Sequence, residues 1–154
     1  MSDDEAQAGV ATRYYAPDEA DRLVPHVAAA FERIGHHRAM VRAIASELAT
    51  LGVDLERPLP PHLRDDTIVA GHIGKALSEH RAITGELGTL AELGVEVKAL
   101  DGLCDVRSWH EGRVVYLCWR VGEARFGHWH ELEAGFAGRK PITEPGDFEG
   151  TLLN

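Results

Sequence analysis

The chain has few cysteines and no long apolar run. Its two cysteines, Cys104 and Cys118, are too few for the disulfide framework of a small secreted protein, so we expect reduced thiols. No window approaches the ~18 consecutive apolar residues that a membrane helix requires. The N-terminal sequence also has no basic segment followed by an apolar one. We therefore expect a soluble, cytoplasmic protein.

Positive charge is scarce as well. The 154 residues include 16 Lys and Arg against 25 Asp and Glu, and the formal net charge is −9. Nucleic acids and anionic membrane surfaces are bound by clustered basic residues that displace counterions. The composition therefore argues against nucleic-acid and membrane partners. A chain of this length is expected to form one domain with a substantial core.

The first half of the chain has helical periodicity. Residues 1–12 are small, acidic and aperiodic, which predicts a mobile tail. Pro17, which is followed by two acidic residues, is typical of the start of a helix. Apolar residues then recur at helical spacing over 23–51, and a second such series covers 69–90. The connector over 52–65 contains three prolines and cannot continue a helix. This pattern predicts a long antiparallel helical hairpin.

The second half of the chain has strand-like alternation. We predict strands over 95–100, 103–109, 113–120 and 125–130, joined by Asp-Gly, Glu-Gly and Gly-Glu turns. The predicted fold class is therefore α+β, with the hairpin packed on a small antiparallel β-meander. The domain should cover residues 13–142, followed by an extended C-terminal tail over 143–154.

Four glycines in the second helix require an explanation, because each costs about 1 kcal/mol relative to Ala in a helix interior. They are Gly71, Gly74, Gly85 and Gly88. Close approach by another element, including a second copy of the chain, is one explanation. A locally frayed helix is the other.

Several motifs carry a family resemblance. They are VYLCW at 115–119, Gly122-Glu123, Trp129-His130 and GFAGRKP at 135–141, after a helical segment that opens YYAPDEADRLVP. Together they resemble the uncharacterised bacterial domain-of-unknown-function family 2203, over about residues 14–142. The resemblance implies a small soluble bacterial protein in which Trp129-His130 is central to the family pattern. It implies no activity.

The His-x-His pair is the main candidate for a ligand site. If Gly122-Glu123 forms a two-residue turn, His128 faces Leu117, and both histidines project from the face opposite Cys118. Alternate strand residues lie about 7 Å apart and are a common source of two metal ligands. We predict that His128 and His130 bind zinc or non-haem iron.

A third ligand is needed for such a metal site. The candidates are Glu131, Glu133, His110, His37, His80, Glu79 and His72. Two alternatives remain open. The imidazoles can cap an aromatic core through hydrogen bonds, or they can transfer protons without a metal. A two-residue turn at Glu111-Gly112 places Val106 opposite Leu117 and Ser108 opposite Val115. In this register the two cysteines lie on opposite faces of the sheet, which disfavours a disulfide.

His37 and His80 form a second candidate pair within the helical seam. Antiparallel pairing places His37 opposite about residues 80–83, so the two imidazoles are expected to meet there. A hydrogen-bonded pair extended by Glu79 and a metal held between the helices are both compatible with this pattern.

Arg139 and Lys140 form a compact basic spot after the glycine-flanked segment 135–138. This spot is a candidate site for a small molecule or anion, and a solvated turn is the alternative. Both predicted sheet faces carry large apolar side chains, and one hairpin covers only one face. We therefore expect a homodimer that buries Tyr116, Trp109 and Trp129, or the glycine side of the second helix.

Two functions follow from the sequence. The first is a small metal-binding protein that uses His128 and His130, with the question of catalysis left open. The second is a non-catalytic dimeric interaction or regulatory module in which the histidines are structural.

Overall fold

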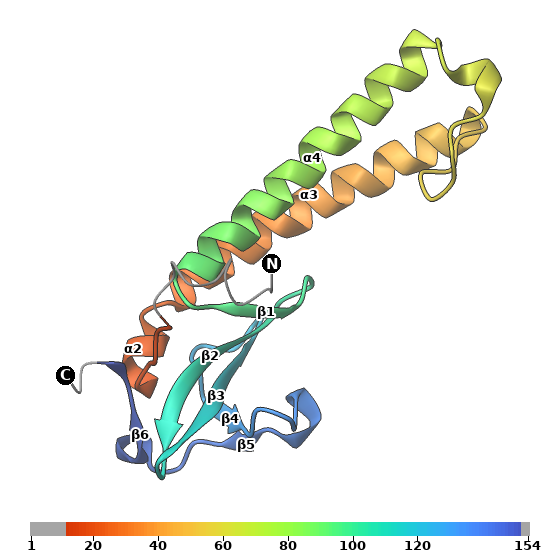
Figure 1. Cartoon of the computed structure of the whole chain (residues 1–154). Helices are drawn as coiled ribbons and strands as arrows, with labels where there is room; N and C mark the ends of the chain where they lie inside the picture. Colours follow the sequence, from red (N-terminus) through yellow and green to blue (C-terminus); the bar gives the residue numbers. More distant parts are fainter. Residues whose placement is uncertain (1–11, 152–154) are drawn as a thin grey trace. The chain divides into compact units, whose positions relative to one another are not determined.

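The computed structural model describes residues 12–151, so nearly all of the predicted mobile tail lies outside the described residues. The fold combines two long helices, α3 (Val24–Thr50) and α4 (Thr67–Glu92), with an antiparallel sheet (Figure 1). The predicted α+β class, with a helical hairpin and a β-meander, is confirmed. Neither long helix carries an apolar stretch that would allow it to cross a membrane, within the part of the chain that the structure describes.

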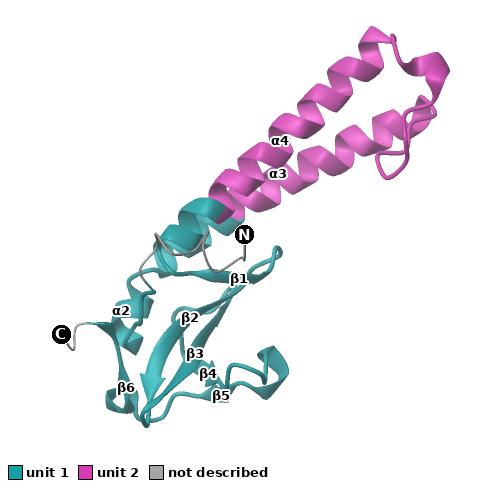
Figure 2. Cartoon of the chain, in the orientation of Figure 1, with its two compact units in different colours: residues 1–31, 88–154 teal, residues 32–87 magenta. Residues whose placement is uncertain are grey.

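The chain divides into two compact units (Figure 2). Unit 1 consists of Met1–Phe31 and Gly88–Asn154, and unit 2 consists of Glu32–Leu87. Unit 1 contains the sheet together with one end of each long helix, and unit 2 contains the rest of the hairpin.

The helices begin where the sequence supplies start signals. The predicted first helix is divided, because a short helix α2 (Pro17–Asp21) precedes α3 and the chain turns at Arg22-Leu23. Pro25 lies in the first turn of α3, where its missing N–H removes no helical hydrogen bond. Before α4, one carboxylate oxygen of Asp66 accepts hydrogen bonds from the N–H groups of Ile68 and Val69, as an N-cap residue does.

Unit 2 is held together by an apolar core and by ion pairs between the helices. The core includes Ile44, Leu48, Val53, Val69 and Ala76. Three pairs of side chains link α3 to α4, each with a nitrogen close to a carboxylate oxygen. These nitrogen-oxygen distances are 2.7 Å for Arg33 and Glu86, 2.5 Å for His37 and Glu79, and 2.6 Å for His72 and Glu47.

The predicted meeting of His37 and His80 is not found in unit 2. The imidazole of His37 is paired with Glu79, and His80 is exposed. Adjacent residues of an α-helix point about 100° apart, so Glu79 and His80 do not face α3 together. Glu79, which we expected to extend the pair, takes the place of His80.

The sheet has the order β1-β2-β3-β4-β5, and β6 pairs with Trp109 and His110 at the end of β2, which β1 does not reach. Its strands are β1 (Glu96–Ala99), β2 (Leu103–His110), β3 (Arg113–Arg120), β4 (His128–His130), β5 (Lys140–Pro141) and β6 (Phe148–Glu149). The β2-β3 register is the predicted one, with Val106 opposite Leu117 and Ser108 opposite Val115. Glu111 and Gly112 both have positive φ, 51° and 78°, as a two-residue hairpin turn requires.

The predicted β3-β4 register is wrong by one residue. Tyr116 pairs with His130, and Cys118 pairs with His128. The connection is a longer loop, because Phe126 leaves the strand. Its N–H donates to the Asp21 carboxylate over 2.8 Å, and its buried ring lies 6.4 Å from that of Trp119. A one-residue shift moves every side chain of a strand to the other face. Both histidines therefore lie on the Cys118 face.

The predicted C-terminal tail packs against the sheet as far as it is described. Phe148 in β6 is buried, and its ring stacks on His110 with centroids 4.3 Å apart. The N–H of Thr151 donates to the carbonyl of Tyr14, which itself forms a parallel bridge to Arg107. Residues 143–151 therefore complete one edge of unit 1.

The α4 glycines lie in a continuous helix, so the helix is not broken at them. A Cβ atom added at Gly71, Gly74 or Gly88 would meet nothing within 4 Å. No part of the described chain closely approaches these positions. A second copy on this side of α4 stays a prediction.

We expect Gly74→Ala to raise the free energy of unfolding by roughly 0.5–1 kcal/mol, because alanine loses less conformational entropy than glycine when a helix forms. Urea denaturation measures this change, and Gly71→Ala provides a second position with equal space. A fall in stability, together with a lower mass in sedimentation, would instead mean that a second copy packs on this side of α4.

Candidate metal centre

Three strands bring a carboxyl group, a thiol and an imidazole to one face of the sheet. Asp105 of β2 is the register partner of Cys118 of β3, and Cys118 is the partner of His128 of β4. His130 lies two residues beyond His128 and so projects from the same face. The ligand atoms of Asp105, Cys118 and His130 all lie within 4.8 Å of one another. We call these three residues the Asp-Cys-His cluster.

The Asp-Cys-His cluster is almost completely shielded from solvent. Asp105 and His130 are each 2% exposed, and Cys118 is 0% exposed. Ionisable groups are rarely buried to this extent unless they are paired or bind a metal. The arrangement of their hydrogen bonds is therefore informative.

His130 directs an unprotonated nitrogen toward a carboxyl group when its imidazole is neutral. Its Nδ1 lies 2.7 Å from the backbone carbonyl of Glu131, which only accepts, so Nδ1 donates. The lone pair of the neutral ring is then on Nε2, which lies 3.1 Å from Oδ2 of Asp105. Two acceptors at this distance require a proton or a cation between them.

Asp105 is the least satisfied member of the cluster. Its Oδ1 is buried and accepts no hydrogen bond from the described residues. Burial raises the pKa of the Asp105 carboxyl group, and the neighbouring His130, Cys118 and Lys98 only partly offset this effect. A buried polar atom without a partner costs about 1–3 kcal/mol. The carboxyl group therefore has an oxygen free to bind a ligand.

The thiol of Cys118 is protonated at neutral pH in the protein by itself. Burial, followed by the nearby Asp105 carboxyl group, raises the pKa of Cys118 to about 12. Arg139 acts in the opposite direction, because its Nη1 lies 4.0 Å from the sulfur. Reactive thiols have a lowered pKa and some exposure, so this environment does not suit an unaided cysteine nucleophile.

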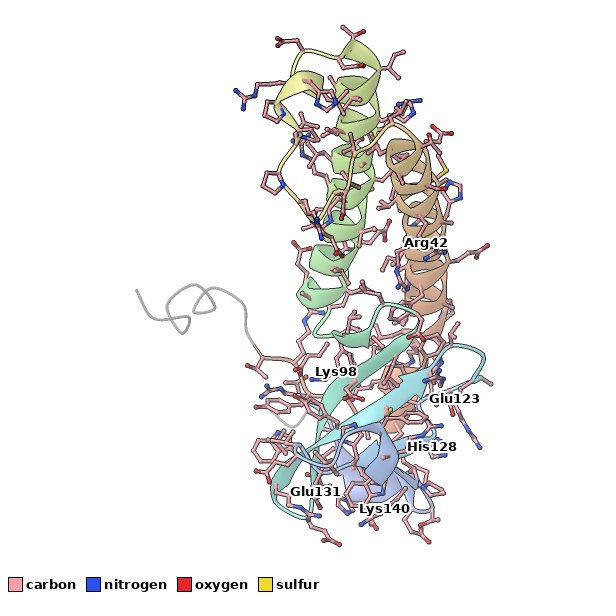
Figure 3. All side chains as sticks on the ribbon, turned by 90° about the vertical axis from the view of Figure 1, so that its right-hand side faces the viewer. Arg42, Lys98, Glu123, His128, Glu131 and Lys140 are labelled. Atoms are coloured by element: carbon pink, nitrogen blue, oxygen red, sulfur yellow. The ribbon has the colours of Figure 1, made fainter. Side chains whose placement is uncertain are left out.

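The guanidinium of Arg139 is held in place by Glu123 through two hydrogen bonds of 2.8 and 3.0 Å. Burial alone would raise the pKa of Glu123, but the paired Arg139 lowers it below its usual range. Nδ1 of His128 lies 3.5 Å from the same carboxylate, and Figure 3 shows the two labelled side chains near each other.

A cavity of about 220 Å³ opens onto the Asp-Cys-His cluster. All three cluster residues line it, and Tyr116 and Lys98 extend the wall on the side of the sheet. The segment after β4 contributes Leu132, Glu133 and Phe136. Small-molecule sites are typically lined by apolar side chains with a few convergent polar groups, and this cavity has both kinds of lining residue.

The histidines predicted to bind a metal have different surroundings. His130 belongs to the cluster, whereas His128 is half-buried beside Glu123. The Glu131 carboxylate is paired with Arg113, with its two oxygens 2.5 and 3.1 Å from guanidinium nitrogens. Glu131 contributes its backbone carbonyl to His130 instead. His37 and His80 belong to unit 2 and are not part of the cluster.

One member of the predicted basic spot, Arg139, is neutralised by an ion pair. Arg139 is paired with Glu123 and packs on the ring of Phe136, with its guanidinium carbon 4.3 Å from the ring centroid. Lys140 is exposed, and its amine lies 5.0 Å from the centroid of Trp129. These two neighbours in the sequence therefore have separate partners.

Two residues of the cluster, Asp105 and Cys118, were not predicted as ligands. The predicted β2-β3 register does place them opposite each other and on one face. An acidic residue between the apolar neighbours Cys104 and Val106 of a buried strand was the available signal. The one-residue shift of β4 brings His130 to the face that carries Asp105 and Cys118.

We expect both thiols of the metal-free native protein to resist a chromogenic disulfide reagent at neutral pH. Burial raises the pKa of Cys104 as well as that of Cys118, and neither thiol is exposed. Unfolding in guanidinium should make both cysteines react quickly. A fast-reacting thiol in the native protein that disappears in Cys118→Ser would contradict the buried, protonated state.

Fold and site together define an α+β protein with a buried carboxyl-thiol-imidazole cluster beside a cavity. The chain belongs to the family DUF2203, described as an uncharacterized conserved protein, whose model matches residues 13–142. This confirms the resemblance found in the sequence. No curated protein and no solved structure matches the chain.

Proposed function

We propose that this protein binds one divalent transition metal ion, zinc in preference to iron, through Asp105, Cys118 and His130. The observation that carries the proposal is the contact between Nε2 of His130 and Oδ2 of Asp105 at 3.1 Å. Two ligand atoms about 2.0 Å from a tetrahedral zinc ion lie about 3.3 Å apart, so this spacing suits two neighbouring ligands.

The surroundings of the three ligands support the proposal. Metal-binding histidines usually donate their other ring N–H to a carbonyl or carboxylate, as Nδ1 of His130 does to Glu131. Two anionic ligands, the Asp105 carboxylate and the Cys118 thiolate, would balance the charge of a divalent ion. Thiolate favours zinc over hard cations such as magnesium.

Three protein ligands are the number found in catalytic rather than structural zinc sites, where a fourth position is open. The cavity beside the cluster provides space for that position. A bound metal would act there as a Lewis acid and lower the pKa of a bound water molecule. The protein residues would hold the ion, orient His130 and shield the centre from bulk solvent.

We expect the purified, tag-free protein to bind one equivalent of Zn²⁺ or Co²⁺, with a sulfur-to-cobalt charge-transfer band for the cobalt form. Cys118→Ser should lose that band, and His130→Ala should lose most of the metal affinity, because each removes one of three ligands. Elemental analysis and absorption spectroscopy measure these effects.

Cys104→Ala and His128→Ala are the matched controls, since each removes the same residue type from outside the cluster. Both variants should retain stoichiometric metal. Retention of metal in Cys118→Ser and His130→Ala would contradict the proposal. It would favour the second function, a non-catalytic module in which the His130-Asp105 pair is structural.

Metal affinity should rise with pH. Metal binding must displace the proton of the Cys118 thiol, whose pKa of about 12 in the metal-free protein lies far above neutrality. Release of the thiol proton alone predicts an apparent affinity that rises about tenfold per pH unit, and displacement of the proton held between His130 and Asp105 adds to this slope. Zinc titrations in buffers of different ionisation enthalpy measure the number of protons released. A pH-independent affinity would mean that the thiol is not a ligand.

A further inference from the structure

Lys98 provides a positive charge at the wall of the cavity, and among residues 12–151 its ion-pair partner, Glu96, is shared with Arg107. Its amine lies 3.6 Å from Oε1 of Glu96. The same oxygen accepts a hydrogen bond from the Tyr116 hydroxyl over 2.9 Å. The other carboxylate oxygen of Glu96 accepts one from Arg107 over 3.1 Å. One carboxylate thus serves two cations, so a net positive charge remains.

The position of Lys98 connects this charge to the cluster. Its amine lies 4.8 Å from the centroid of the Tyr116 ring, and that ring is 5.4 Å from the ring of His130. The positive charge of Lys98 also lowers the pKa of Asp105, although burial outweighs this effect. Lys98 therefore contributes a positive electrostatic potential to the cavity that the Asp-Cys-His cluster lines.

The remaining walls favour a ligand with an apolar body. Leu103, Leu132, Phe136 and the Tyr116 ring line the cavity. Its volume of about 220 Å³ lies below the roughly 300–1,000 Å³ of sites for drug-sized molecules, which restricts the ligand to a small molecule. Glu133 adds a negative charge to the wall, which disfavours a second negative charge on the ligand.

We propose that the cavity binds a small organic monocarboxylate, with the carboxylate between Lys98 and the open metal position and the apolar body against Tyr116, Leu132 and Phe136. This inference rests on the proposed metal centre. A divalent ion with two anionic ligands is neutral, so the attraction for a carboxylate comes from the open metal position and from the nearby amine of Lys98, and Glu133 limits the ligand to one negative charge.

Titration of the cobalt-loaded protein with benzoate tests this proposal. Benzoate should change the ligand-field absorption of cobalt in a saturable way, because its carboxylate enters the coordination sphere. Benzamide, which has nearly the same shape and no charge, should bind more weakly. Lys98→Gln should weaken benzoate binding about tenfold, since it removes a charge-assisted contact, and should leave cobalt stoichiometry unchanged. Lys75→Gln, which removes a lysine from unit 2, is the matched control.

The possible results distinguish a failure of the carboxylate proposal from a failure of the metal-binding proposal. If cobalt binds with its charge-transfer band but benzoate leaves the spectrum unchanged, the carboxylate proposal is overturned and the metal centre stands. Equal benzoate affinity in Lys98→Gln and Lys75→Gln overturns the role of Lys98. If cobalt does not bind at all, both the metal centre and the carboxylate site are rejected.

Discussion

The register of the short strand β4 is the constraint on which the candidate site depends. Because Cys118 pairs with His128, His130 reaches the face that also carries Asp105. A shift of one residue would turn the His130 imidazole toward the opposite face, where Trp119 and Val115 are buried. The chemistry of the site is therefore set by the loop that precedes β4 as much as by the ligands themselves.

That loop is fixed by one contact over a long sequence separation and by others between residues closer in the chain. The N–H of Phe126 donates to Asp21 in α2, and the indole N–H of Trp119 donates to the carbonyl of Glu123. The Glu123 side chain in turn holds Arg139, whose guanidinium reaches the sulfur of Cys118. The loop between β3 and β4 thus positions two features. One is β4, which carries His130, and the other is the guanidinium of Arg139, which lies beside the Cys118 thiol.

Local signals in the sequence were sufficient for most of the fold. Periodicity predicted both long helices, and the Glu111-Gly112 turn fixed the β2-β3 register. These features depend on residues close together in the chain. The β3-β4 register depends on Asp21, which lies more than a hundred residues from Phe126, and periodicity holds no information about that contact. The face of His128 and His130 was therefore predicted wrongly, although their common direction was predicted correctly.

The hydrogen bonds of His130 distinguish the Asp-Cys-His cluster from a catalytic triad. In a nucleophilic triad, the imidazole lies between the thiol and the carboxylate and accepts the thiol proton. Here, Nδ1 of His130 is committed to the Glu131 carbonyl, so Nε2 is the nitrogen left for both Asp105 and Cys118. A triad imidazole uses one ring nitrogen for the thiol and the other for the carboxylate. The imidazole of His130 has Nε2 alone for both groups, so it cannot relay a proton between them. It can serve with them as one of three ligands, because a cation attracts all three groups to the same point.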